Sequence, residues 1–177
     1  MSKFWKHLKT VVRHRWYVCK LCCHCGIVWQ GLVHDLSKFS FAEFLPAIKY
    51  ANGKQSPHEG EIKDHGYSAA WLHHKGRNKH HFEYWLDPIH SSTPCRMPAK
   101  YLVEMICDRV GAGMAYGGKS FQNDAPLKYL RSKAAKERPL MHPDTYRTLE
   151  HALVLLADNG IDSLVAFCKH LLNGGND

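Results

Sequence analysis

Apolar residues recur at three- and four-residue steps along most of the chain, which is the spacing of one buried face on an α-helix. The N-terminal stretch shows this pattern in Trp5, Leu8, Val11, Val12, Trp16 and Cys19. It predicts a first helix over about 4–24, which Gly26 is expected to break. Helical spacing then resumes over Ile27–His34.

Further helices are predicted from the same spacing together with prolines, caps and glycine breaks. They cover Phe41–Tyr50, His65–His74, Pro98–Ala115, Pro126–Lys136, Pro143–Ala157 and Asp162–Leu172, the last with Asp162 as its cap. Ser40 is expected to cap the helix that starts at Phe41, with Glu43 as its capping-box partner and Asn52-Gly53 as its end. Gly117-Gly118 is expected to end the long helix after Pro98.

The segments between these helices are polar, and none of the chain alternates as a half-buried strand does. Residues 53–64 and 87–97 contain prolines and are predicted loops. A length of 177 residues suits one domain. We therefore predict a single all-α domain over 1–177, a bundle of about seven helices in which helices of 126–172 pack on a core of 14–115.

Composition excludes several classes of protein. Hydrophobic residues make up 45% and charged residues 23%, which argues against disorder and against a fibrous repeat. The longest apolar stretches, such as Ala152–Ala157, are far shorter than the ~20 residues that cross a bilayer. The basic N-terminus has no long apolar signal region, so we expect a cytoplasmic protein. Its cysteines, including the cluster of 19–25, are interpreted as reduced and structural, and its five tryptophans as core.

The formal charge of +8 favours anionic partners, which are phosphorylated small molecules, nucleic acid or a membrane surface. Charge alone does not choose among them. The N-terminal stretch is both basic and amphipathic, so a surface anchor is one alternative there.

Histidine is the unusual entry in the composition, with 14 residues. His34 and Asp35 stand side by side and offer one nitrogen and one oxygen to an ion flanking a helix end, since neighbouring helical residues diverge by about 100°. His14 precedes them on the first helix, and Asp108 follows within an apolar helical stripe, where an acid is costly to bury unless it is paired or binds a metal. Such a nitrogen–oxygen set suits iron, manganese, zinc or nickel.

The strings around these four residues resemble the HD-domain superfamily of metal-dependent phosphohydrolases. Leu32-Val33-His34-Asp35-Leu36-Ser37-Lys38 is similar to its central motif, His14 to Val18 to its first motif, and Cys107-Asp108-Arg109-Val110 to its last. The resemblance covers about 14–115. More narrowly, the string W-x-H-H-x-x-x-N-x-H-H-x-x-Y-W from Trp71 is similar to a small HD-like family of unknown function, which implies no substrate.

Four histidines fall within nine residues: His73, His74, His80 and His81. Many HD enzymes carry two histidines in this interval that bind a second metal, with the Asp of the pair bridging both ions. The resemblance therefore implies His73, His74 and His80 as further metal ligands and His81 as a catalytic residue, without deciding which of them, or of the neighbouring His65, bind metal. A solvated basic turn is the alternative.

The resemblance implies one or two divalent ions (iron, manganese, zinc, nickel or magnesium) and hydrolysis of a phosphomonoester or phosphodiester, a nucleotide among the candidates. Asp35, Lys38 and His81 would be catalytic, because Lys38 holds the lysine position of the central motif. Lys75, Arg77 and Lys119 are the expected substrate-binding cations, whereas Arg109 is interpreted as an ordinary salt-bridge partner. The alternatives are an HD-type di-iron oxygenase and a non-catalytic module that binds nucleic acid.

Overall fold

The structure is a computed structural model that describes residues 2–50, 57–89 and 93–175. Within them the α-helices are α1 (Lys3–Cys25), α2 (Val28–Val33), α3 (Phe41–Tyr50), α4 (Pro57–His65), α5 (Ala69–Lys75), α6 (Ala99–Gly117), α7 (Ala125–Glu137), α8 (Pro143–Asn159) and α9 (Ile161–Leu172). Short 3-10 turns are η1 (Leu36–Phe39), η2 (Phe82–Trp85), η3 (Gly118–Ser120) and η4 (Arg138–Leu140). No strand occurs in these ranges, which confirms the all-α class.

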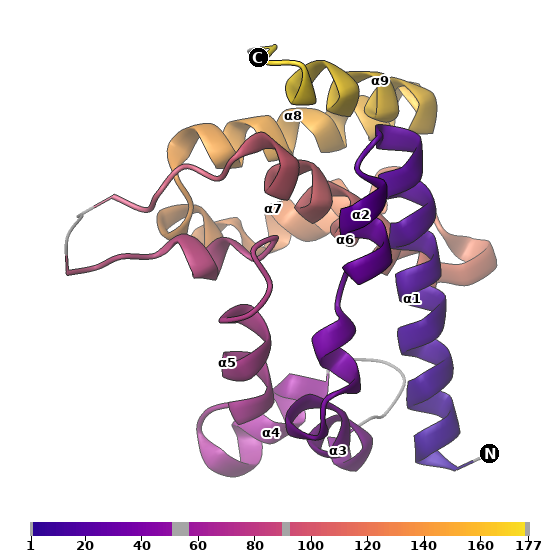
Figure 1. The fold of residues 1–177 in the computed structure, drawn as a ribbon, viewed down its shortest axis with the longest axis vertical. Helices are drawn as coiled ribbons and strands as arrows, with labels where there is room; N and C mark the ends of the chain where they lie inside the picture. Colours follow the sequence, from indigo (N-terminus) through magenta and orange to yellow (C-terminus); the bar gives the residue numbers. More distant parts are fainter. Residues whose placement is uncertain (1, 51–56, 90–92, 176–177) are drawn as a thin grey trace.

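Helix α1 runs along one side of the molecule from α3 and α4 at one end to α9 at the other (Figure 1). One face packs against α6 and another against α2. The inward face is formed by Val11, His14, Val18, Leu21, Cys22 and Cys25. Gly26 ends the helix with φ of 90°, a left-handed conformation that glycine adopts without strain.

The hydrophobic core lies between α1 and the C-terminal half of the chain. Its fully buried side chains include Ile106 of α6, Leu130 of α7, Leu153 of α8 and Leu164 of α9. Helices α8 and α9 cover this core at the end of α1 opposite to α3 and α4 (Figure 1). The half of the molecule built by α3, α4 and α5 contributes little to it, so histidines and carboxylates can meet between the two halves.

The prediction of a loop over 53–64 is wrong for residues 57 onward, where α4 begins at Pro57. The expected helix end at Asn52-Gly53 lies outside the described residues. The expected helix over His65–His74 starts only at Ala69, because Gly66 adopts a left-handed φ of 77° and ends α4. Ser68 then caps α5 by accepting a hydrogen bond from the Trp71 amide. These interruptions help explain why the described residues hold nine α-helices rather than about seven.

Two predicted caps are also wrong. The Ser40 hydroxyl has no hydrogen-bond partner among the described residues, and the Glu43 side chain contacts His73 and His74 of α5 instead of the Ser40 amide. The N-cap of α9 is Gly160 rather than Asp162. In both cases an acidic residue near the start of a helix was expected to take part in capping. Tertiary contacts of Glu43 and the backbone geometry at Gly160 determine a different arrangement.

The interpretation of the tryptophans as core residues is wrong for Trp5, Trp16 and Trp29, which are exposed. The seven cysteines are free; Cys22, Cys25, Cys107 and Cys168 are buried, whereas Cys23 and Cys95 are exposed. Across the described ranges, no helix combines the length and apolar character that crossing a bilayer requires.

Gly111 provides a direct test of the α1–α6 contact. A Cβ added there would lie 2.6 Å from Val18 Cγ2 and 3.2 Å from the Val18 amide nitrogen, and that backbone cannot move without separating the helices. We expect Gly111→Ala to lower the free energy of unfolding by about 1–3 kcal/mol in urea titrations. Gly113→Ala is the control, because its methyl group meets a Phe121 ring that can move. An equal effect of both variants would contradict the close-packing argument.

Candidate metal centre

Residues from five parts of the chain meet at the junction of α1, α5 and α6. His14 comes from α1 and Asp108 from α6, while His34 and Asp35 lie between α2 and η1. His74 is in the last turn of α5, and His80 and His81 lie directly before η2. Two groups of side chains each place their ligand atoms within 4.8 Å of one another: His14, His34, Asp35, Asp108 and, separately, Asp35, His74, His80, His81.

The first group surrounds one carboxylate oxygen of Asp35. Oδ2 of Asp35 lies 3.4 Å from His14 Nε2 and 3.3 Å from His34 Nε2. Oδ1 of Asp108 lies 3.1 Å from His14 Nε2 and 3.4 Å from His34 Nε2. Ligands held about 2.0–2.2 Å from one ion lie about 3.0–3.5 Å apart in tetrahedral or octahedral geometry. The spacing therefore fits a single bound ion.

The second group uses the other oxygen of the same carboxylate. Oδ1 of Asp35 lies 3.3 Å from His74 Nε2 and 3.4 Å from His80 Nε2. His81 belongs to this group, and its Nε2 is buried. Asp35 thus presents each of its oxygens to a different set of imidazoles.

The opposite nitrogen of three of these rings is bound by a carboxylate. Glu104 Oε1 lies 3.0 Å from His34 Nδ1 and 2.9 Å from His80 Nδ1, and Glu43 Oε2 lies 2.7 Å from His74 Nδ1. A carboxylate on Nδ1 holds a proton there, so Nε2 is the nitrogen that can bind a metal once it is deprotonated, the arrangement typical of metal-binding histidines. The ligand atoms of His34, His80 and Glu104 also lie within 4.8 Å of one another. The contacts of Glu104 with the two Nδ1 atoms account for this proximity.

The inward-facing atoms lack hydrogen-bond partners among the described residues. This holds for Nε2 of His14, His34, His80 and His81 and for both oxygens of Asp35, all of which are buried. Lys38 Nζ approaches Asp35 Oδ2 to 2.5 Å as an ion pair, but one ammonium does not satisfy the imidazoles. Buried unsatisfied polar atoms are costly, and a cation between them would remove that cost. The donor set therefore fits divalent metal.

The backbone at Asp35 is also unusual. Its φ of 54° makes it the one non-glycine residue of the described ranges in a left-handed conformation. Aspartate and asparagine tolerate this conformation better than most residues do, yet it persists only where surrounding contacts hold it. Here it turns the carboxylate toward both groups of histidines.

The buried carboxylates shift the pKa of the histidines. Burial lowers the pKa of His34, but the charge of Asp35 and the close approach of the Asp108 and Asp35 carboxylates to its Nε2 outweigh burial and raise that pKa well above the ordinary value. The pKa values of His74 and His80 are raised in the same way, against burial, by the nearby Asp35 carboxylate and by the hydrogen bonds to their glutamates. Burial and the charges of His80 and His74 instead hold the pKa of His81 well below its usual range.

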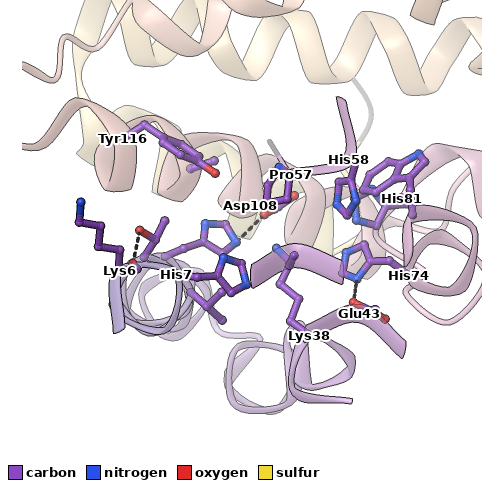
Figure 2. Close-up of a pocket in the computed structure, with 16 residues that line it drawn as sticks. Lys6, His7, Lys38, Glu43, Pro57, His58, His74, His81, Asp108 and Tyr116 are labelled. Atoms are coloured by element: carbon purple, nitrogen blue, oxygen red, sulfur yellow. Dashed lines mark hydrogen bonds and ion pairs between the residues drawn. The ribbon is translucent and has the colours of Figure 1, made fainter. Parts of the chain in front are cut away.

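Two adjoining cavities give access to this centre. One of about 270 Å³ is lined by His14, Lys38, His74, His81 and Asp108, with Lys6 and His7 at its α1 side. Figure 2 shows Lys38 rising into this cavity, opposite Tyr116. A second cavity of about 590 Å³ shares His81, Asp108 and Tyr116 with the first and extends toward α7. A small molecule could therefore reach both groups of donors.

Most of the residues expected from sequence meet here, but not all. His73 belongs to neither group of donors, and its Nδ1 lies 2.7 Å from Glu43 Oε1. Lys75, Arg77 and Lys119 line neither cavity, which counts against their expected contact with substrate. Arg109 donates to Glu137 at 2.8 Å, as interpreted.

Some residues at or beside the centre were not predicted from the sequence to belong to it. Glu104 lies four residues before Asp108, so their shared helix face was a usable signal. Glu43 was interpreted as a cap, and nothing local connects it with His74. His58 lines the cavity beside Trp71, and burial, with the charge of His74, lowers its pKa to about 4.

The fold and the site thus define an all-helical protein with a buried histidine–carboxylate centre of metal-binding geometry. The chain belongs to a family described as a family of unknown function (DUF5662), whose model matches residues 3–155. The match spans α1 to most of α8 and includes every residue of the centre. Searches of curated proteins and of solved structures found no match.

We expect the stabilisation by metal to grow with pH. The raised pKa values of His34, His74 and His80 stabilise the metal-free fold below their ordinary value of 6.5, and this contribution is lost as pH rises through the folded-state values. Bound metal replaces those protons. The increase in Tm on adding zinc or manganese to chelator-treated protein should therefore be larger at pH 8 than at pH 6. An increase that is independent of pH would contradict this account.

Removing the charge that orients two of the rings should weaken metal binding. We expect Glu104→Gln to reduce metal affinity about 10–100-fold in chelator competition, because Glu104 holds Nδ1 of both His34 and His80. Glu150→Gln, on the surface of α8, is the matched control and should bind metal like the wild type. Equal affinity of the two variants would show that Nε2 of these rings does not bind the ion.

Proposed function

We propose that this protein is a metal-dependent phosphohydrolase of the HD type, acting on a phosphomonoester or phosphodiester. The observation that carries the proposal is Asp35, whose two oxygens face two separate sets of imidazoles. This is the pattern expected of a carboxylate shared by two ions. The order of His14, His34, Asp35 and Asp108 along the chain agrees with the resemblance.

A bound divalent ion supplies a water of lowered pKa and polarises a phosphoryl oxygen. The chain's own residues would then place the phosphate and stabilise its charge. Lys38 lines the cavity, and its pKa is raised, against burial, by Asp35 and Asp108, so it stays protonated and can donate to a phosphoryl oxygen. Asp35 and Asp108 stay ionised, because their histidine neighbours outweigh burial and hold both pKa values well below the usual range.

The cavity supports an anionic substrate of small size. Lys6 and Lys38 line it, and its two carboxylates, Glu43 and Asp108, already contact histidines. A cavity of about 270 Å³ suits a small phosphorylated molecule better than a duplex. A nucleotide remains one candidate substrate within this class.

A di-iron oxygenase is the competing function, because the same nitrogen–oxygen donors suit iron. Purified protein should be analysed for metal and then assayed with a panel of phosphate esters and nucleotides, aerobically and anaerobically. The proposal requires phosphate release without oxygen when manganese, zinc or magnesium is supplied. Turnover that requires both iron and oxygen would overturn it in favour of the oxygenase, and absence of bound metal would overturn both.

Asp35→Asn should abolish phosphatase activity, because the amide keeps the shape of the side chain and tolerates the backbone conformation but loses the charge. We expect metal content to fall with activity while the circular-dichroism spectrum is retained. Folded Asp35→Asn protein with wild-type activity would exclude this carboxylate from catalysis.

Substitutions of single Lys and Arg residues distinguish the cation that lines the cavity from the substrate-binding cations that the sequence predicts. Lys38→Met should lower kcat about 10²–10³-fold with metal content unchanged, because it removes one donor to the developing phosphoryl charge. Lys75→Met, Arg77→Met and Lys119→Met should leave kcat and KM near wild type, since these residues line neither cavity. The reverse pattern would place the substrate elsewhere.

A further inference from the structure

The outer face of α1 carries a stripe of exposed apolar side chains that the proposed reaction does not use. Trp5, Val12 and Trp16 are 58%, 52% and 59% exposed. Steps of seven and four residues place them on one side of a helix. His14 lies nine residues from Trp5, which is about 180° around the helix. The stripe and the metal centre are therefore on opposite faces of α1.

Helix α2 lies beside α1 (Figure 1) and also carries exposed apolar side chains. Its Trp29 is 70% exposed, and Val28 and Leu32 are also exposed. Gly31 packs against α1, where an added Cβ would lie 2.8 Å from Cys22 Cβ, so the two helices lie close together. Trp5, Trp16 and Trp29 thus place three exposed indoles on two adjacent helices. We call Trp5, Val12, Trp16, Val28, Trp29 and Leu32 the tryptophan surface.

Positive charge borders the tryptophan surface. Helix α1 contains six basic residues and no Asp or Glu. Lys9, Arg13 and Lys20 follow the apolar stripe around the helix by about 40–80° and are exposed. None of these three has an ion-pair partner within 2–50, 57–89 and 93–175. Lys20 Nζ lies 5.6 Å from the centre of the Trp16 ring, which joins the charged and aromatic rows.

We propose that the tryptophan surface binds the face of an anionic lipid bilayer, with α1 lying in the plane of the interface. Indoles favour the boundary between headgroups and acyl chains, and unpaired Lys and Arg beside them attract acidic headgroups. Val12, Val28 and Leu32 present no flat ring on which a nucleic-acid base could stack, so lipid fits the surface better than nucleic acid does. Since the metal centre lies across α1, its cavity would remain open to water.

The test is flotation of the purified protein with phosphatidylcholine vesicles and with vesicles that also contain phosphatidylglycerol. We expect binding to the mixed vesicles at low salt, little binding to neutral ones, and release at high salt. The triple variant Trp5→Ala, Trp16→Ala, Trp29→Ala and the triple variant Lys9→Glu, Arg13→Glu, Lys20→Glu should each lower the partition coefficient at least about tenfold.

Control substitutions of the same kinds lie elsewhere on the surface. Tyr67→Ala removes an equally exposed ring, and the pair Lys136→Glu, Lys169→Glu reverses exposed lysines of α7 and α9. Both controls should bind vesicles like the wild type, and circular dichroism should show every variant to be folded. The test does not depend on the proposed phosphohydrolase activity, which is measured without lipid.

Four results would overturn the proposal. They are failure to bind mixed vesicles at low salt, equal binding to neutral vesicles, unchanged binding of the tryptophan variant, and equal loss in the control variants. A dimer in solution that the tryptophan variant dissociates would assign the surface to a second copy of the chain. DNA binding that needs the three cations but not the tryptophans would assign the charge to nucleic acid.

Discussion

Four carboxylates, Asp35, Glu43, Glu104 and Asp108, face the interior of the junction between α1, α5 and α6, and one lysine, Lys38, stands among them. Negative charge held away from water is tolerated only when cations or hydrogen-bond donors face it. His34, His74 and His80, whose pKa values are raised, meet this requirement in part by accepting protons. Divalent metal would meet it more fully, because it also satisfies the unpaired Nε2 atoms. The stability of the centre thus depends on positive charge, from protonated histidines, Lys38 or bound metal, facing these four carboxylates.

The packing of the helices brings the carboxylates and the histidines close enough for their charges and hydrogen bonds to compensate one another. Glu104 and Asp108 occupy successive turns of α6, so one orients His34 and His80 while the other approaches His14 and His34. Gly111, one turn further, lets α6 approach α1 closely enough for that contact. The left-handed backbone at Asp35 completes the centre by aiming one carboxylate at both groups of histidines.

Helix α1 has two different faces with different chemistry. Its inward face contributes His14 to the centre and Val18 to the core, and its outward face carries Trp5 and Trp16. Because α1 packs on α6 and α2, the apolar side chains on its remaining face are left exposed to solvent. The same helix therefore joins a buried polar site to an exposed apolar surface, and contact at one face need not obstruct the cavity behind the other.

The sequence alone was enough to predict the all-α class, most helix boundaries after Pro98, and the donor types of the centre at His14, His34, Asp35 and Asp108. Those features follow from the periodicity of apolar residues and from short sequence motifs, and both are properties of residues that are close together in the chain. Tertiary packing decided that His74, His80 and His81 approach Asp35 while His73 does not, that Glu43 and Glu104 orient the rings, and that the tryptophans of α1 face outward. Each of these outcomes depends on which helix lies opposite, across tens of residues of chain. Periodicity reports that a helix has two faces, but only the packed structure determines what each face meets.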